Sequence, residues 1–343
     1  MKTKRLRITI AAAGVFILAL GFFAPKAFPF EHATHAHIAE HVGNAEVREN
    51  SDTIYAAMAP GFANLVFDFP EHQACLSDQT DMQFMKVWAG APRAGPGVWL
   101  AYGFLSHNDV WGADSVAHHH GMTFGRDEGY VTAKASLLAD ILEDYEPYAE
   151  LGFPREVTEA LCQKLVEDGL DILVKGLDPS MGRKITSAAF FRTSDFPVLL
   201  VKAYARCLAE ARGVSTHEAS KFIVEIETEF RKQMMLYGEA LGRRDPVPVV
   251  ARITAGIVVD FLAASQLLPA GIGIDEIAPI VEFGISQSTA ICADDLEGEI
   301  EATIDFVRES LEANGITWYP RTAAEARRPW SPARERRKEG DMI

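Results

Sequence analysis

Residues 105–118 read LSHNDVWGADSVAH, and the fold and site predictions start from this stretch. In a continuous helix, His107, Trp111, Asp114 and His118 follow the spacing i, i+4, i+7, i+11 and share one narrow stripe. Towards the N-terminus the stripe is apolar, so we expect it to face the core. Unpaired buried charge is costly, and a metal ion offsets that cost. Imidazole plus carboxylate suits zinc; the alternative is a hydrogen-bonded His–Asp pair in the core.

A second histidine-rich stretch, residues 34–42, reads THAHIAEHV. If Thr34 caps a helix here, His35 shares its face with apolar residues and points inward. His37 and Glu40 then lie on the opposite, solvent-facing side. We therefore predict His35 as a metal ligand, with an ordinary core histidine as the alternative.

The remainder of the chain is mostly helical, because apolar residues recur at spacings of three and four. Ser215 and Glu218 form a capping box, and strand-like alternation is scarce. The simplest interpretation is a single all-α domain over residues 28–318, with a two-domain split near Pro179 as the alternative. The expected helices lie near residues 34–44, 97–119, 127–145, 155–175, 195–212, 216–240, 247–267, 274–290 and 294–314.

Composition excludes several classes of protein. The chain has 343 residues, of which 48% are hydrophobic and 24% charged, which rules out a disordered chain, a collagen-like fibre and a multi-span membrane protein. Residues 25–320 hold 22 basic and 44 acidic residues, a net charge of −22. Such an acidic surface is a poor match for nucleic acid, which requires a basic stripe. The acidic charge does not exclude a phosphate ester that is bound through metal ions, because the metals supply positive charge.

The N-terminus has the pattern of an export signal. Four basic residues precede an apolar run from Ile8 to Ala24, which is short for a membrane span. We predict a signal peptide over residues 1–24 and a periplasmic or secreted protein; the alternative is an uncleaved N-terminal membrane anchor. Residues 319–343 are basic and are predicted to form a disordered tail.

Four cysteines are widely spaced, with no C-x-x-C pair. In an exported protein they allow up to two disulfides in any of three connectivities, and four buried thiols are the alternative. The cysteines are Cys75, Cys162, Cys207 and Cys292.

A family resemblance rests on three short segments. They are Thr34-His35 with Ile38-Ala39, the Ala57-Met58-Ala59-Pro60 turn, and Gly103-Phe104-Leu105-Ser106-His107 followed by Asp114 and His118. Together they resemble the zinc-dependent phospholipase C family, which shares its fold with single-strand-specific zinc nucleases. The resemblance covers about residues 30–125. It implies an all-α fold, one to three zinc ions, and hydrolysis of phosphodiester bonds in phospholipids or nucleic acids.

Carried over by residue, the resemblance assigns most of the ligands. It implies that His35 is the early histidine ligand, that His107 begins the central ligand helix, and that Asp114 and His118 are its later ligands. His72 matches the second early histidine.

The sequence also departs from the family pattern. Gly61 stands where the family often has an aspartate, and Asp68 lies near enough in sequence to substitute. No His-x-x-x-Glu pair follows downstream, so the last metal site is either absent or built from Asp127, Glu128 or another carboxylate.

The function expected from these observations is metal-assisted hydrolysis of a phosphodiester outside the cytoplasm. Asp68 or Asp109 would act as base or orient ligands. The acidic body favours a phospholipid over a nucleic acid, with contact to a membrane surface. The competing hypothesis is a non-catalytic exported helical protein with a single-metal or degenerate site; a single-strand nuclease is a second alternative.

Overall fold

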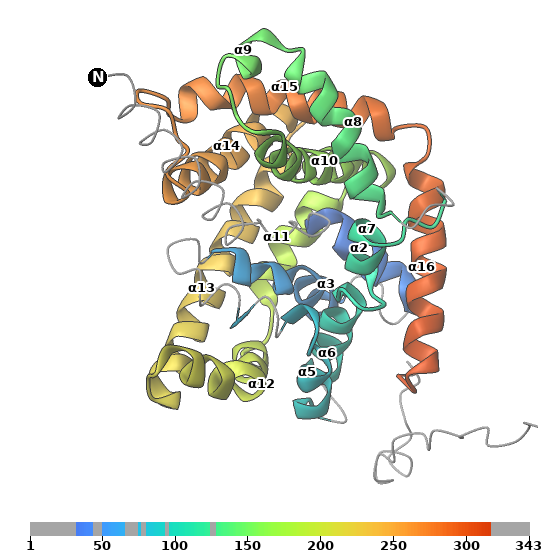
Figure 1. Ribbon diagram of the computed structural model, residues 1–343. Helices are drawn as coiled ribbons and strands as arrows, with labels where there is room; N and C mark the ends of the chain where they lie inside the picture. The colour runs from blue at the N-terminus through green and yellow to red at the C-terminus, as the bar shows by residue number, and fades with distance from the viewer. Residues whose placement is uncertain are drawn as a thin grey trace, which may run out of the picture.

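The computed structural model describes residues 32–43, 50–65, 75–76, 80–92, 96–123 and 128–316, and within these ranges every regular element is a helix (Figure 1). The all-α prediction is confirmed. The predicted signal peptide and basic tail lie outside the described residues, as do Asp68, His72 and Asp127. The helices are α2 (His32–Val42), α3 (Ser51–Met58), the 3-10 helix η1 (Ala59–Leu65), α5 (Met85–Gly90), α6 (Pro96–His107), α7 (Ala113–His118), α8 (Tyr130–Glu143), α9 (Glu146–Ala149), α10 (Arg155–Leu177), α11 (Met181–Phe191), α12 (Asp195–Arg212), α13 (Thr216–Leu241), α14 (Val247–Ala264), α15 (Ile274–Cys292) and α16 (Leu296–Ala313).

Helix α3 was not expected from the sequence. Asn50 caps its N-terminus by accepting hydrogen bonds from the backbone N–H groups of Asp52 and Thr53. Every residue from Asp52 to Met58 is buried, so α3 has no polar face. A helix buried on all sides lacks the 3.6-residue amphipathic period, which explains why the pattern did not reveal it.

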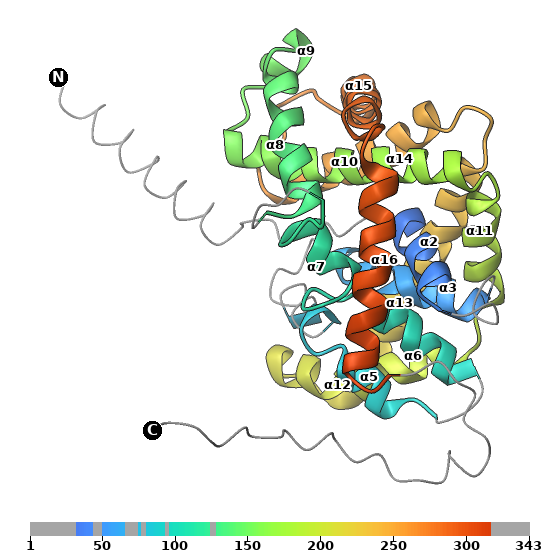
Figure 2. The same cartoon turned by 90° about the vertical axis from the view of Figure 1, so that its right-hand side faces the viewer.

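Helix α2 occupies the middle of the fold. Figures 1 and 2 show α8, α9, α10, α14 and α15 at one end and α5, α6 and α12 at the other, with α2 between the two groups. It contacts α3, α6, α10, α11 and α16. Alanines at positions 33, 36 and 39 are fully buried and allow these neighbours to approach closely. Glu40 is buried rather than solvent-facing, since it accepts two hydrogen bonds from the Lys184 ammonium at 2.9 and 2.8 Å.

A buried carboxylate from α10 caps the N-terminus of α2. Asp171 accepts hydrogen bonds from the backbone N–H groups of Ala33 and Thr34, both at 2.8 Å. It also accepts from the Thr34 hydroxyl at 2.8 Å and the Tyr237 hydroxyl at 2.7 Å. Thr34 therefore lies inside the helix rather than at its N-cap, and the capping oxygens come from Asp171.

The C-terminal end of α2 is held from another distant segment. The Arg308 guanidinium on α16 donates to the carbonyl oxygens of Val42 at 3.2 Å and His41 at 3.0 Å. A cation at a helix C-terminus also interacts favourably with the helix dipole. Figure 2 shows α16 running along the molecule in front of α2.

Helix α10 carries a buried stripe of ionisable residues. Lys164, Glu167, Asp168 and Asp171 follow the spacing i, i+3, i+4, i+7 and are at most 4% exposed. Lys164 and Asp168 pair at 2.6 Å, and Asp168 also accepts the Thr254 hydroxyl of α14 at 2.6 Å. This buried stripe connects α10 to its neighbouring helices, because buried charges require partners.

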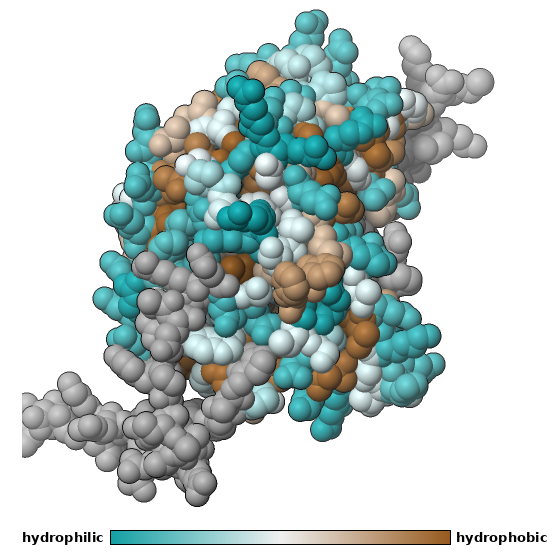
Figure 3. Space-filling view, turned by 180° about the vertical axis from the view of Figure 1, so that it is seen from behind, coloured by the Kyte–Doolittle hydropathy of each residue, from teal (hydrophilic) through white to brown (hydrophobic). Residues whose placement is uncertain are grey.

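Helix α14 is apolar and only partly covered. Among the described residues it is the one helix long and apolar enough to cross a membrane, a test that core helices of other proteins also pass. Only 33% of its 18-residue window is buried, and the window includes Arg252 and Asp260. Figure 3 shows apolar side chains scattered among polar ones on the face opposite to that of Figure 1.

Replacing Asp171 with alanine should destabilise the fold by about 3 kcal/mol or more, because four buried donors lose their acceptor. Asp171→Asn keeps one carbonyl oxygen and should cost less. Urea unfolding followed by circular dichroism measures both changes. Glu156→Ala, at an exposed position in the first turn of the same helix, is the matched control and should stay within about 0.5 kcal/mol of wild type. Equal stability of Asp171→Ala and wild type would contradict the assigned role of the cap.

Candidate metal centre

The helix expected over residues 97–119 is interrupted between α6 and α7. The side-chain oxygen of Asn108 accepts hydrogen bonds from the backbone N–H groups of Val110 and Trp111, each at 2.9 Å. Its side-chain NH₂ group donates to the Leu105 carbonyl oxygen at 2.7 Å. These bonds replace helical ones and form a tight turn. Gly112 closes the turn, where a β-carbon would lie 2.2 Å from the carbonyl oxygen of His107. The prediction of one continuous helical stripe through residue 118 is therefore wrong, because Asn108 and Gly112 end α6 at His107.

Trp111 consequently leaves the predicted stripe. It lies in the turn, partly buried, and its ring packs edge-on against Phe84 with centroids 5.1 Å apart. Core packing is thus the role that the structure gives this tryptophan.

Three of the predicted ligands nevertheless converge. His35 from α2, His107 from α6 and Asp114 from α7 each offer one ligand atom, and these atoms lie within 4.8 Å of one another. All three residues are buried, and the two imidazole rings stack with centroids 3.9 Å apart. The inward orientation predicted for His35 is confirmed. Three residues from separate helices thus form one buried cluster of groups that could hold a metal ion.

A hydrogen bond determines how His107 presents its ring. Its Nδ1 lies 2.9 Å from the carbonyl oxygen of Ala57, which can only accept, so Nδ1 carries the proton. The lone pair of the neutral ring therefore resides on Nε2. Metal-ligating histidines commonly donate their other N–H to a carbonyl in this way.

Burial keeps the two imidazoles neutral. Desolvation lowers the pKa of His35 well below its usual range, and nearby histidines lower it further. The pKa of His107 falls to about 3, mainly through burial. A neutral imidazole keeps the lone pair that a metal ion requires.

Burial has the opposite effect on the carboxyl group of the cluster. Desolvation raises the pKa of Asp114 well above its usual range, and the charges of Asp81 and Asp109 raise it further. Asp114 Oδ1 accepts no hydrogen bond from the residues that the structure describes. A cation in the cluster would remove this penalty, because it would favour the ionised carboxylate.

His118 and Glu167 extend the cluster. The His118 Nε2 atom lies 3.5 Å from Asp114 Oδ1 and 3.7 Å from Glu167 Oε1. Glu167 comes from α10 and is fully buried. Glu167 is not among the residues predicted from the sequence. The sequence feature that could have revealed Glu167 is the polar stripe of α10 described above. Ionisable residues that recur at helical spacing among apolar ones indicate a buried polar face.

Asp109, predicted as a catalytic residue, lies outside the three-residue cluster. Its Oδ1 atom is 2.8 Å from His119 Nε2, and the two side chains are 26% and 50% exposed. The pair thus lies nearer to solvent than the buried cluster does. Its charge reaches the cluster, because it raises the pKa of Asp114.

Gly61, at the position where the resemblance implies an aspartate, lies beside another histidine. A β-carbon there would be 3.4 Å from His32 Cε1 and 3.7 Å from Phe230, which are ordinary contact distances. His32 in turn is close enough to lower the pKa of both His35 and His107. The backbone therefore has room for a larger residue at this point, although the carboxylate itself is missing.

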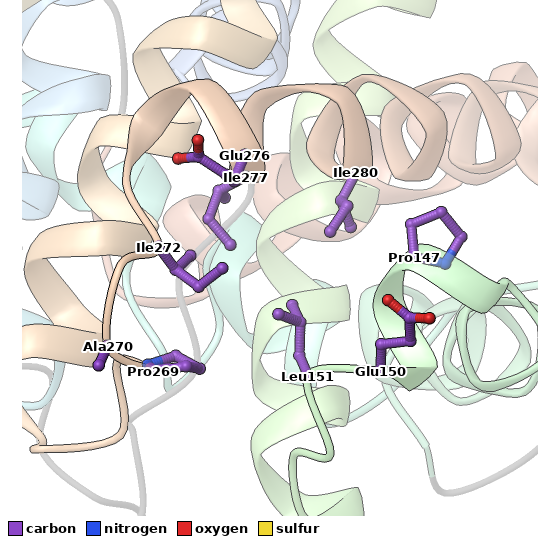
Figure 4. Close-up of a pocket in the computed structure, with 9 residues that line it drawn as sticks. All are labelled: Pro147, Glu150, Leu151, Pro269, Ala270, Ile272, Glu276, Ile277 and Ile280. Carbon is purple, nitrogen blue, oxygen red and sulfur yellow. The ribbon is translucent and has the colours of Figure 1, made fainter.

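A pocket of about 330 Å³ lies elsewhere, between the α9 region and α15 (Figure 4). Apolar side chains dominate its wall, together with the carboxylates of Glu150 and Glu276. None of the predicted site residues lines it, so the candidate chemistry resides in the buried cluster and not in this pocket.

Comparison of the chain with models of protein families, with curated proteins and with solved structures finds no match in any of the three. The family resemblance of residues 30–125 therefore stays a prediction from its motifs.

Substituting Gly112 with alanine should lower the free energy of unfolding by about 2–4 kcal/mol, because the new β-carbon collides with the backbone of His107 and Asn108. Gly176→Ala is the control, since a β-carbon in this exposed turn of α10 meets nothing within 4 Å. It should be neutral or stabilising by up to about 1 kcal/mol. Urea unfolding distinguishes the two, and a tolerated Gly112→Ala would refute the tight turn.

Acidification should destabilise the protein in part through His37. Burial lowers the pKa of His37 from 6.5 to about 4, so between these values the unfolded chain binds a proton that the folded chain does not. Stability therefore falls as the pH drops from 6.5 to 4, by up to about 1.4 kcal/mol per pH unit for this residue. His37→Gln should lessen that slope in urea titrations. A slope for His37→Gln parallel to that of the wild type would contradict the prediction.

Proposed function

We propose that this chain is a zinc-dependent phosphodiester hydrolase of the phospholipase C type. The observation that carries the proposal is the buried convergence of His35, His107 and Asp114 from three separate helices. Neutral imidazoles and a carboxyl group together are the ligand set of many zinc sites. A helical fold is consistent with the phospholipase C fold, which is part of this proposal.

The chemistry of the cluster residues fits the binding of a divalent cation better than ordinary packing in a hydrophobic core. Burying two imidazoles and a carboxyl group is costly without compensation. The fixed Nδ1–H bond of His107 leaves Nε2 available, and Asp114 Oδ1 accepts no hydrogen bond within the described structure. Both features are those of a ligand shell prepared for a metal ion.

His35, His107 and Asp114 would hold the first ion. His118 lies beside both Asp114 and Glu167. His118 and Glu167 would serve a neighbouring position, where Glu167 would be the downstream carboxylate that the sequence motif lacks. At this site a bound zinc ion would supply Lewis acidity and a water molecule activated near neutral pH. The buried helices around the cluster exclude bulk water from the ligands. Asp109, which pairs with His119 at a more exposed position, would orient ligands or act as the base.

Charge favours a phospholipid as the substrate. The net charge of −22 over residues 25–320 repels a nucleic-acid backbone, whereas a single phosphodiester needs only local positive charge from the metal. A phospholipid headgroup outside the cytoplasm fits both this charge and the predicted export signal.

The decisive experiment measures zinc per chain by elemental mass spectrometry on protein made without affinity histidines, together with hydrolysis of phosphatidylcholine vesicles. We expect at least one zinc ion per chain. His107→Ala and Asp114→Ala should lose metal and at least about 100-fold in activity, because each removes a ligand. Glu167→Gln and His118→Ala should lower metal content as well. His120→Ala, an exposed neighbour in sequence, is the control and should behave as wild type.

Circular dichroism of each variant separates loss of the ligand from loss of the fold. Metal that remains bound in a folded Asp114→Ala protein would contradict the assigned site. One tightly bound zinc ion without hydrolysis would instead favour the non-catalytic helical protein, for which the glycine at position 61 is the supporting observation. Preferential cleavage of single-stranded DNA would favour the nuclease.

A further inference from the structure

Two of the four cysteines meet although they are far apart in the sequence. The Sγ atoms of Cys75 and Cys207 lie 3.0 Å apart and are separated by 132 positions along the chain. Cys207 is on α12, and both residues are partly buried. Three pairings of the four cysteines were compatible with the sequence, and this contact distinguishes one pair.

The other two cysteines are in a different situation. Cys162 on α10 and Cys292 on α15 are both fully buried. Burial raises the pKa of the Cys292 thiol to about 12 and raises that of Cys162 far above its usual range. Thiolate is the reactive form, so these two cysteines are inert structural residues.

We propose that Cys75 and Cys207 form a disulfide bond by exchange with a disulfide donor, either glutathione disulfide or a thiol–disulfide oxidoreductase. One cysteine loses a proton, and its thiolate attacks the donor disulfide, which releases one donor thiol and leaves a mixed disulfide. The second cysteine, also as thiolate, attacks the mixed disulfide and releases the other donor thiol. The protein thus loses two electrons and two protons, and the donor disulfide is reduced to two thiols.

The geometry supports this bond independently of the proposed hydrolase function. A disulfide brings its sulfur atoms to about 2.05 Å, so a separation of 3.0 Å requires only a small side-chain adjustment. Partial exposure gives a donor access to the pair. The predicted export signal would deliver the chain to an oxidising compartment, where such bonds persist.

The test equilibrates the purified full-length chain in a buffer containing mostly glutathione disulfide, followed by alkylation and peptide mapping. We expect a peptide containing Cys75 linked to one containing Cys207, with Cys162 and Cys292 alkylated only after denaturation. The linked protein should lose about 5 °C or more in melting temperature when a reductant is added, because the bond closes a long loop.

Two serine variants make the outcome specific. Cys75→Ser should leave Cys207 open to alkylation and should remove the effect of reductant on melting. Cys162→Ser, the control, should keep the linked peptide. Separate alkylation of Cys75 and Cys207 in the oxidising buffer would overturn the proposal, and so would linkage of either one to Cys162 or Cys292.

Discussion

The carboxylate of Asp171 is the contact on which the centre of this fold depends. It is fully buried, and it accepts from the first turn of α2 and from Tyr237 of α13 at once. Because the first N–H groups of a helix have no partner within the helix, a buried helix start requires an acceptor from elsewhere. Asp171 supplies it and thereby positions α2, which carries His35 into the cluster.

The same constraint organises the candidate metal centre. Glu167 lies one helical turn before Asp171 on α10, so the residue that caps α2 and the residue that faces His118 belong to one polar stripe. Each ionisable group of this stripe is acceptable in the core only with a partner. The Lys164–Asp168 pair has its partner in the protein. Glu167 lies 3.7 Å from His118, and for Asp114 a bound cation is the partner proposed above.

Local patterns in the sequence were informative where a helix has one polar and one apolar face. The inward direction of His35 and the neighbouring positions of Asp114 and His118 followed from spacing alone. Spacing could not reveal α3, which is buried all round, nor the turn after His107, where the Asn108 side chain competes with the helix. It could not assign a partner to Glu167 either, because that contact joins α10 to α7 across 49 positions of sequence. The partner of Glu167 depends on which helices pack together over long distances in the sequence.

The two caps of α2 also have a consequence for how the chain folds. Its N-terminal partner lies 137 and 138 positions away and its C-terminal partner 266 and 267 positions away. Such contacts raise the contact order, which slows folding relative to helical proteins held by neighbouring segments. During synthesis α2 emerges long before α10 and α16, so its native surroundings exist only once nearly the whole domain has been made. The surroundings of the central histidine cluster are accordingly complete only after α16 has been synthesised.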